Sequence, residues 1–123
     1  MKKPVEVKWL DKLVDKDYLS AETFLQLLYE PKKAHKWAVA LKNAKMAKFA
    51  AKDVLRASAT PISEVQAFDW VKQHQAIAEG KKLAPILFVR QDNGGHLIIA
   101  DGFHRLCAVF HKDQEALVPC KIV

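Results

Sequence analysis

Hydrophobic residues in the first 45 positions recur at helical spacing, with charged residues between them. Over residues 5–16 they fall on one stripe, which predicts an amphipathic helix. Ser20 is a suitable N-cap for a second helix. The buried face of that helix is predicted to hold four apolar residues, Phe24, Leu25, Leu27 and Leu28. Pro31 is tolerated in a first helical turn, so a third helix is predicted to begin there.

From position 46 onward the apolar runs become shorter and richer in β-branched and aromatic residues, which favours strands. Residues 46–51 predict a short strand, and Asp53 is placed to cap one helical turn after it. A longer helix is predicted to begin at Ser63 and to end at Gly80, a residue that suits the position just past a helix.

The last forty residues predict a hairpin, a helix and a final strand. Residues 85–90 and 96–100 are the predicted hairpin strands, and glycines at 94 and 95 favour a turn between them. A helix follows over residues 103–111. Residues 117–123 predict a strand in which Pro119 suggests an edge position or a strand start. We therefore expect an α+β fold, a small mixed sheet with packed helices, in which a helical extension (1–45) precedes a domain over 46–123.

Composition supports an ordinary folded core. Half of the residues are hydrophobic, which is enough for a core that needs no disulfides. Cys107 and Cys120 are too few for a disulfide framework or a zinc site, so both are expected to be thiols packed in the core. The basic start is not followed by an apolar run, and no apolar stretch is long enough to span a membrane. We expect a cytoplasmic protein with no membrane partner.

The net charge of +6 comes from the amino-terminal half of the chain. Between positions 32 and 56, Asp53 is the only acidic residue among many lysines. Such a segment can attract nucleic acid, with Lys42, Lys45, Lys48 and Lys52 as the candidate contacts. The other interpretation is a solvated lysine-rich helix face, which the scarcity of arginine and of interleaved aromatic residues favours.

The junction between the predicted strand 96–100 and the predicted helix 103–111 is the strongest local signal for chemistry. A helix that begins directly after a strand presents backbone N–H groups and the positive end of its dipole at one point. Gly102 allows a tight turn and a close approach to the backbone. This arrangement favours an anion, so Gly102 and Phe103 are candidate phosphate-binding positions.

Side chains of the same loop strengthen that interpretation. Arg105 can offer a planar fork of donors to phosphate oxygens. His104 can donate a hydrogen bond, or a positive charge when it is protonated. Asp101 would repel a phosphate unless it holds a metal ion, accepts a proton or turns away to cap the helix. No metal site is expected on the following helix, because His104 and His111 are about 10.5 Å apart along the axis at 1.5 Å per residue.

The wider sequence around this loop resembles a known superfamily. The stretch LAPILFVRQDNGGHLIIADGFHRLCAVF, with VPCKIV after it and AKDVLRASATPISE before it, is similar to the ParB/sulfiredoxin-like domain, or ParB-like nuclease domain. The similarity covers residues 46–123 and is greatest to short stand-alone bacterial members. It implies a phosphate- or nucleotide-binding function for the 101–105 loop.

Departures from the family pattern narrow the expected activity. Sulfiredoxins need a cysteine where Phe103 stands, so sulfinic-acid repair is not expected. ParB partition proteins continue into a helix-turn-helix DNA reader, and none follows the loop within these 123 residues. The most similar loop is Asp-Gly-His-His-Arg of the ADP-dependent free-serine kinase, which differs only at Phe103. That kinase uses an upstream glutamate as its base, and the acids in the corresponding region here are Asp53 and Glu64.

Taken together, these patterns predict a nucleotide- or phosphate-binding domain. If it is an enzyme, phosphoryl transfer or nucleotide hydrolysis is expected, with a nucleoside di- or triphosphate and Mg²⁺. Asp101 and His104 would then be the catalytic residues, with Asp101 holding the ion or accepting a proton. His104 and Arg105 would neutralise the phosphate. The alternative is a nucleic-acid-binding module that uses the basic segment 32–56.

Overall fold

The computed structural model describes residues 6–61, 71–91 and 95–123. Its centre is a mixed sheet in the order β2-β6-β4-β5, built from four strands: β2 (Ala47–Ala50), β4 (Ile86–Val89), β5 (Ile98–Asp101) and β6 (Leu117–Ile122). The β2–β6 and β4–β5 pairs are antiparallel, whereas β4 and β6 run parallel. The chain is thus an α+β protein, as the sequence predicts.

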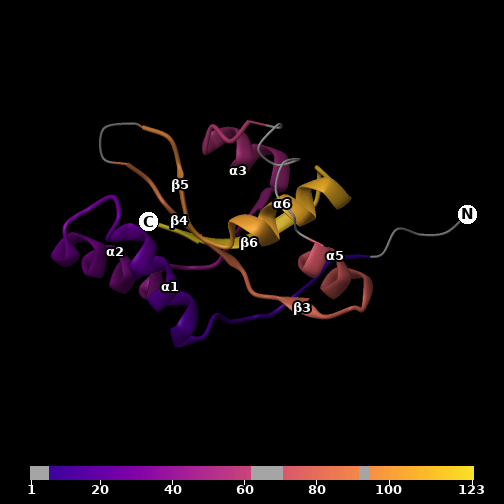
Figure 1. Ribbon diagram of the computed structural model, residues 1–123, viewed down its shortest axis with the longest axis horizontal. Helices are drawn as coiled ribbons and strands as arrows, with labels where there is room; N and C mark the ends of the chain where they lie inside the picture. The colour runs from indigo at the N-terminus through magenta and orange to yellow at the C-terminus, as the bar shows by residue number, and fades with distance from the viewer. Residues whose placement is uncertain (1–5, 62–70, 92–94) are drawn as a thin grey trace, which may run out of the picture.

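Helices cover both faces of this sheet, as Figure 1 shows. One face packs against α1 (Asp15–Leu25) and α2 (Pro31–Asn43). The helices of the other face are α3 (Ala51–Ala57), α5 (Val71–Ala78) and α6 (Phe103–Lys112). Successive side chains of a strand point to opposite faces. Accordingly, Ile86 and Phe88 of β4 pack on the α6 side, and Leu87 and Val89 pack on the α1–α2 side.

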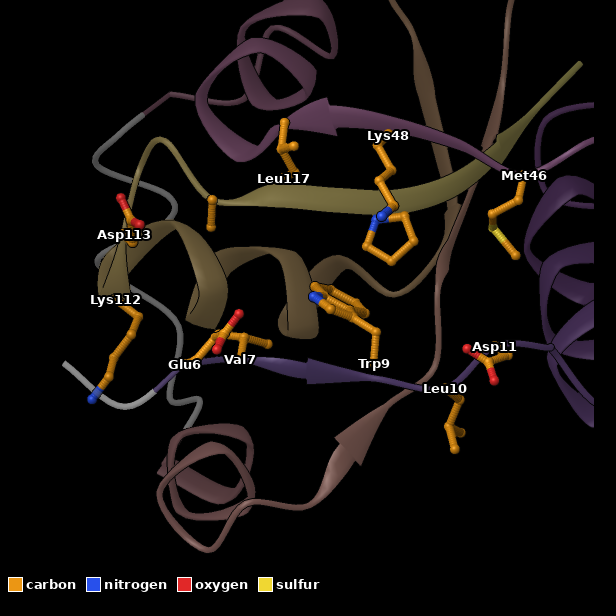
Figure 2. A pocket seen from close by; sticks show the side chains of 12 residues that line it. Glu6, Val7, Trp9, Leu10, Asp11, Met46, Lys48, Lys112, Asp113 and Leu117 are labelled. Carbon is orange, nitrogen blue, oxygen red and sulfur yellow. The ribbon is translucent and has the colours of Figure 1, made fainter. Parts of the chain in front are cut away.

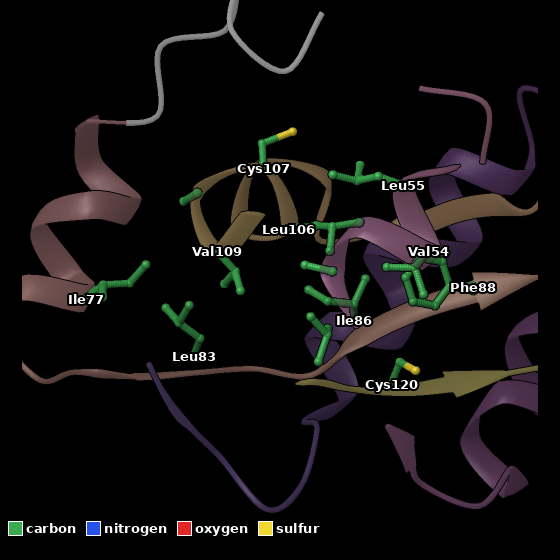
Figure 3. Packing of buried hydrophobic residues seen from close by; sticks show 13 residues of the cluster. Val54, Leu55, Ile77, Leu83, Ile86, Phe88, Leu106, Cys107, Val109 and Cys120 are labelled. Atoms are coloured by element: carbon green, nitrogen blue, oxygen red, sulfur yellow. The ribbon is translucent and has the colours of Figure 1, made fainter. Parts of the chain in front are cut away.

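The α6 side holds the larger hydrophobic cluster. Figure 3 shows Leu106 and Val109 of α6 pointing toward Ile86 of β4 and toward Leu83. Leu83 belongs to β3 (Lys82–Leu83), which pairs in parallel with β1 (Lys8–Trp9). Cys107 and Cys120 are buried and are not joined in a disulfide, as expected. Burial raises the pKa of the Cys120 thiol to about 11.

The predicted helix over residues 5–16 is wrong where the structure describes it. Residues 8–9 form β1, and the Leu10 N–H donates to the Leu83 carbonyl over 2.8 Å. The first helix, α1, begins only at Asp15. The alternating spacing of Val7 and Trp9 fits a strand, whereas Trp9, Leu10 and Leu13 fit a helix, and pairing with β3 decides between the two.

The prediction that Ser20 caps a helix is also wrong, because Ser20 lies inside α1. The carboxylate of Asp17 accepts a 2.9 Å hydrogen bond from the Val14 N–H at the helix start. Of the four residues predicted to be buried, Leu25 alone is buried. The other three are exposed: Phe24 by 37%, Leu27 by 82% and Leu28 by 53%. The third predicted helix is confirmed, since α2 begins at Pro31.

Predictions for the second half agree better with the structure. The strands at 46–51 and 85–90 and the helix at 103–111 are confirmed as β2, β4 and α6. Asp53 lies within α3 and does not cap it, because Ala50 occupies the N-cap position. Ser63, the predicted start of a helix, lies outside the described residues, as do residues 93–94 of the predicted turn. Gly80 follows α5 with a φ of 73°, and its N–H donates to the Ile77 carbonyl, as predicted for a residue just past a helix.

The edge position suggested by Pro119 is wrong, because β6 lies between β2 and β4. Pairing of β6 with β4 begins only at Cys120, opposite Ile86. At Pro119 the recorded register has a partner on one side only, Lys48 of β2. The proline therefore lies in a part of this interior strand that is paired on one side only, where its missing N–H is tolerated.

In the part of the chain that is described, no helix is long and apolar enough to cross a membrane.

Candidate functional site

The candidate loop lies where β5 passes directly into α6. Gly102 is the N-cap of α6 and has a φ of 103°, in the left-handed region. A Cβ atom at this position would lie 2.6 Å from Ile86 Cδ1 and 2.8 Å from Arg105 Nη2. The site therefore needs glycine for its backbone conformation and for space. The Leu106 N–H donates to the Gly102 carbonyl over 2.9 Å, which begins the helical hydrogen-bond series.

Arg105 is held against the strand side of this turn. Its Nη2 lies 3.3 Å from Asp101 Oδ2 and donates to the Pro85 carbonyl over 3.2 Å. The side chains of Arg105 and Asp101 are only 22% and 18% exposed. The buried Nε of Arg105 has no hydrogen-bond partner among the described residues. The guanidinium is thus a partly buried cation beside the start of α6.

Asp101 does not have the capping role considered as one alternative. The N-cap residue is Gly102, and the Asp101 carboxylate faces Arg105 instead. Burial raises the pKa of the Asp101 carboxyl above its ordinary value, while the Arg105 charge acts to lower it. The charge of Asp17, on α1, also raises this pKa by repulsion. A buried acid of this kind favours a proton or a cation as its neighbour.

The remaining loop residues face different surroundings. His104 is exposed, and its ring meets the Phe103 ring edge-on, with the centroids 5.7 Å apart. Phe103 is partly buried and lines a hollow of about 430 Å³. Phe24, at the end of α1, and Leu28, in the turn after it, line the same hollow. The predicted phosphate loop therefore borders a second, more apolar space.

The four candidate nucleic-acid lysines are exposed and spread over several elements. Lys42, on α2, lies 3.3 Å from Asp15, and Lys52, on α3, lies 2.6 Å from Glu115. Bonding to Glu115 raises the pKa of Lys52. Lys48 is on β2, which lies at the edge of the sheet, and Lys45 precedes that strand. The structure therefore distributes these lysines over α2, β2, α3 and the segment before β2, and pairs two of them with acids.

A larger hollow of about 840 Å³ lies between β1 and the β2–β6 strands. In Figure 2 the Trp9 side chain points from β1 toward these strands, and Lys48 points from β2 into the same space. The walls carry charges of both signs, including Glu6, Asp11 and Lys112. None of the 101–105 residues lines this hollow, so its size does not bear on the candidate loop.

Sequence reasoning missed the residues that other segments bring to the loop. These are Asp17, which acts on the Asp101 pKa, the Pro85 carbonyl, and Phe24 beside Phe103 in the smaller hollow. Two of the three come from residues 1–45, which the sequence places in an extension. The sequence carried no signal for Phe24, which its pattern predicts to be buried, and its 37% exposure is known only from the structure. Of the acids considered as a base, Asp53 is exposed and lies 3.3 Å from Arg56, and Glu64 lies outside the described residues.

Among the described residues, no group of three or more His, Cys, Asp or Glu side chains is arranged to hold a metal ion. Comparisons of the chain with protein-family models, with curated proteins and with solved structures give no match.

Proposed function

We propose that the protein binds the phosphate groups of a nucleotide at the 101–105 loop. The observation that carries the proposal is the junction itself, where a left-handed Gly102 starts α6 beside a partly buried arginine. The helix start supplies oriented N–H dipoles, and Arg105 supplies a full charge in a low-dielectric setting. Together they favour an anion of the size and charge of phosphate. The similarity to the ParB/sulfiredoxin-like loop agrees with this proposal.

Asp101 sets the conditions under which a phosphate binds. Its carboxylate already accepts a hydrogen bond from Nη2 of Arg105. A guanidinium has five N–H donors, so a phosphate can bind to others of these donors at the same time. Repulsion between Asp101 and the phosphate then favours a shared divalent ion or a proton on the acid. In a catalytic version, Asp101 would hold the Mg²⁺ of a nucleoside di- or triphosphate, and His104 and Arg105 would neutralise the phosphate.

Calorimetry with inorganic phosphate, ADP and CTP, each with and without Mg²⁺, tests the proposal. Arg105→Ala is expected to weaken binding by about 1.5–3 kcal/mol, roughly ten- to a hundred-fold, and Arg105→Lys to recover only part of the loss. Arg56→Ala is the matched control, because Arg56 also pairs with an acid nearby in the sequence, Asp53, but is 85% exposed. The proposal fails if wild type binds none of these ligands, or if folded Arg105→Ala binds them as tightly as wild type.

The nucleic-acid alternative rests on Lys45 and Lys48, which are exposed near the sheet edge. It predicts affinity for a polynucleotide that falls steeply with salt and is insensitive to Arg105. Fluorescence polarisation with a labelled oligonucleotide at two salt concentrations separates the two functions. The pairing of Lys42 and Lys52 with acids makes this alternative the weaker one.

A further inference from the structure

The 430 Å³ hollow beside Phe103 lies along the outer edge of β5. Ile98 and Ile99, whose side chains point to opposite faces of the sheet, both line it. Since β5 is the last strand in the sheet order, the hollow opens over the edge of the sheet. Its volume lies in the range of small-molecule sites.

Aromatic and aliphatic side chains from separate parts of the chain form the apolar walls of this cleft. Phe24 and Leu28 come from the end of α1 and the turn after it, and Phe103 comes from the first turn of α6. Phe24 and Leu28 are 37% and 53% exposed, which is unusual for apolar residues next to a core. An exposed apolar surface that lines a hollow is typical of a ligand-binding groove.

We propose that this cleft receives the base of the nucleotide whose phosphates bind at the 101–105 loop. The inference rests on the proposed function, and Phe103 connects the two, because it is the first residue of α6 and also lines the cleft. A planar base has an apolar face that stacks on aromatic rings. A peptide strand added to β5 is a poorer fit, since the Leu97 N–H just before this strand already donates to the Ala57 carbonyl over 2.9 Å.

A hydroxyl group of the cleft favours a base with an amino group. Ser58 Oγ donates to the Leu55 carbonyl over 2.8 Å, so in its 2.8 Å contact with Thr60 the threonine must be the donor. The remaining capacity of the Thr60 hydroxyl is therefore that of an acceptor. Gln91 donates one of its two amide N–H groups to the His96 carbonyl, which leaves its oxygen as an acceptor and its second N–H as a donor. Thr60 therefore carries the preference, since the Gln91 amide and the His96 ring can take either role.

The experiment compares ligands that contain the phosphate with and without the base. Calorimetry is run with pyrophosphate, ribose 5-phosphate, ADP, CDP and UDP on wild type, Phe24→Ala and Phe49→Ala. Phe49 is the control, because it is a phenylalanine of similar exposure, 43%, on β2 and outside the cleft. Phe24→Ala is expected to weaken the three nucleotides roughly five- to a hundred-fold and to leave the two base-free ligands unchanged. Phe49→Ala is expected to change neither class.

A second pair of variants keeps the test valid if Phe24→Ala does not fold. Leu28→Ala alters the same wall, and Leu27→Ala is its control, since Leu27 is 82% exposed and lies outside the cleft. ADP and CDP are expected to bind wild type more tightly than UDP, and Thr60→Val is expected to remove that preference. The assignment of the cleft is overturned if nucleotides bind no more tightly than ribose 5-phosphate, or if cleft and control variants behave alike.

Failure of this inference is distinguishable from failure of the proposed function. If pyrophosphate binding depends on Arg105 but no cleft variant affects nucleotides, the cleft assignment is wrong and the phosphate site stands. If nucleotide binding depends on Phe24 but not on Arg105, the phosphate site is wrong and the base cleft stands. If wild type binds none of the five ligands, both are wrong.

Discussion

Two cationic regions of this molecule hold their charge in opposite ways. Arg105 is 22% exposed and is fixed by Asp101 and by the Pro85 carbonyl at a helix start. Lys42, in the basic segment 32–56, is 62% exposed, and its partner Asp15 is 85% exposed. Exposed ion pairs are screened by water and salt and contribute little to stability. The charge of a partly buried cation is screened less, and contacts with its neighbours hold its guanidinium in one orientation. The excess of lysine therefore says less about function than one arginine in a defined position does.

Of the variants considered, Gly102→Ala is expected to have the largest effect on stability and phosphate binding, because it disrupts the junction that positions Arg105. The variant combines a left-handed backbone conformation with a Cβ 2.6 Å from Ile86 and 2.8 Å from the Arg105 guanidinium. We expect a loss of about 2–4 kcal/mol in the free energy of unfolding, and weaker phosphate binding. Urea denaturation and calorimetry measure the two effects.

The matched control for this variant is Gly80→Ala. Gly80 also has a positive φ, 73°, but the nearest atom to its added Cβ would be Lys8 Nζ at 3.7 Å. Only the conformational cost, about 1 kcal/mol, is expected there. Equal losses in the two variants would show that the close packing of Arg105 against Gly102 does not matter.

Asp101→Asn is expected to have an intermediate effect that depends on pH. Burial raises the pKa of Asp101, so the folded protein keeps this proton to a higher pH than the unfolded chain does. Wild type therefore loses stability as the pH rises from the unfolded carboxyl pKa, about 3.9, through the raised folded value. Asparagine does not ionise, so the stability of the variant relative to wild type should increase across this window and then level off.

Urea denaturation at a series of pH values checks this expectation. A relative stability that decreases with pH would show that the Arg105 charge outweighs burial at Asp101. Sulfate binding gives a second measurement, since sulfate keeps its charge over this range. The asparagine variant should bind sulfate more tightly than wild type above the raised pKa, because the repelling carboxylate is gone.

Lys45→Gln and Lys48→Gln are expected to have the smallest effects. Both side chains are exposed, so neither variant should change the melting temperature or the affinity for ADP. If wild type binds an oligonucleotide, each variant should reduce the slope of log affinity against log salt by about one. A nucleotide affinity that falls with either lysine would remove the contrast between the two cationic regions.

Local sequence patterns were sufficient for the elements around the candidate loop. The apolar run of β4, the glycine at position 102 and the amphipathic pattern of α6 are each local signals, and all three elements are where the pattern predicts. Periodicity misplaced the first helix, because the six apolar residues over residues 5–16 include both helical and alternating spacings. Pairing of β1 with β3, more than seventy residues away along the chain, decided that segment.

The candidate site shows the same division between what local sequence predicts and what tertiary structure adds. The sequence by itself determined which groups the loop offers: a permissive glycine, a histidine and an arginine at the start of a helix. Tertiary structure alone decided that Arg105 rests on the Pro85 carbonyl, that Asp17 acts on Asp101, and that Phe24 shares a cleft with Phe103. These contacts join segments that are distant in sequence, and no local periodicity records them. The first exists because β4 pairs with β5, and the other two because α1 packs on the sheet and contacts the edge strand β5.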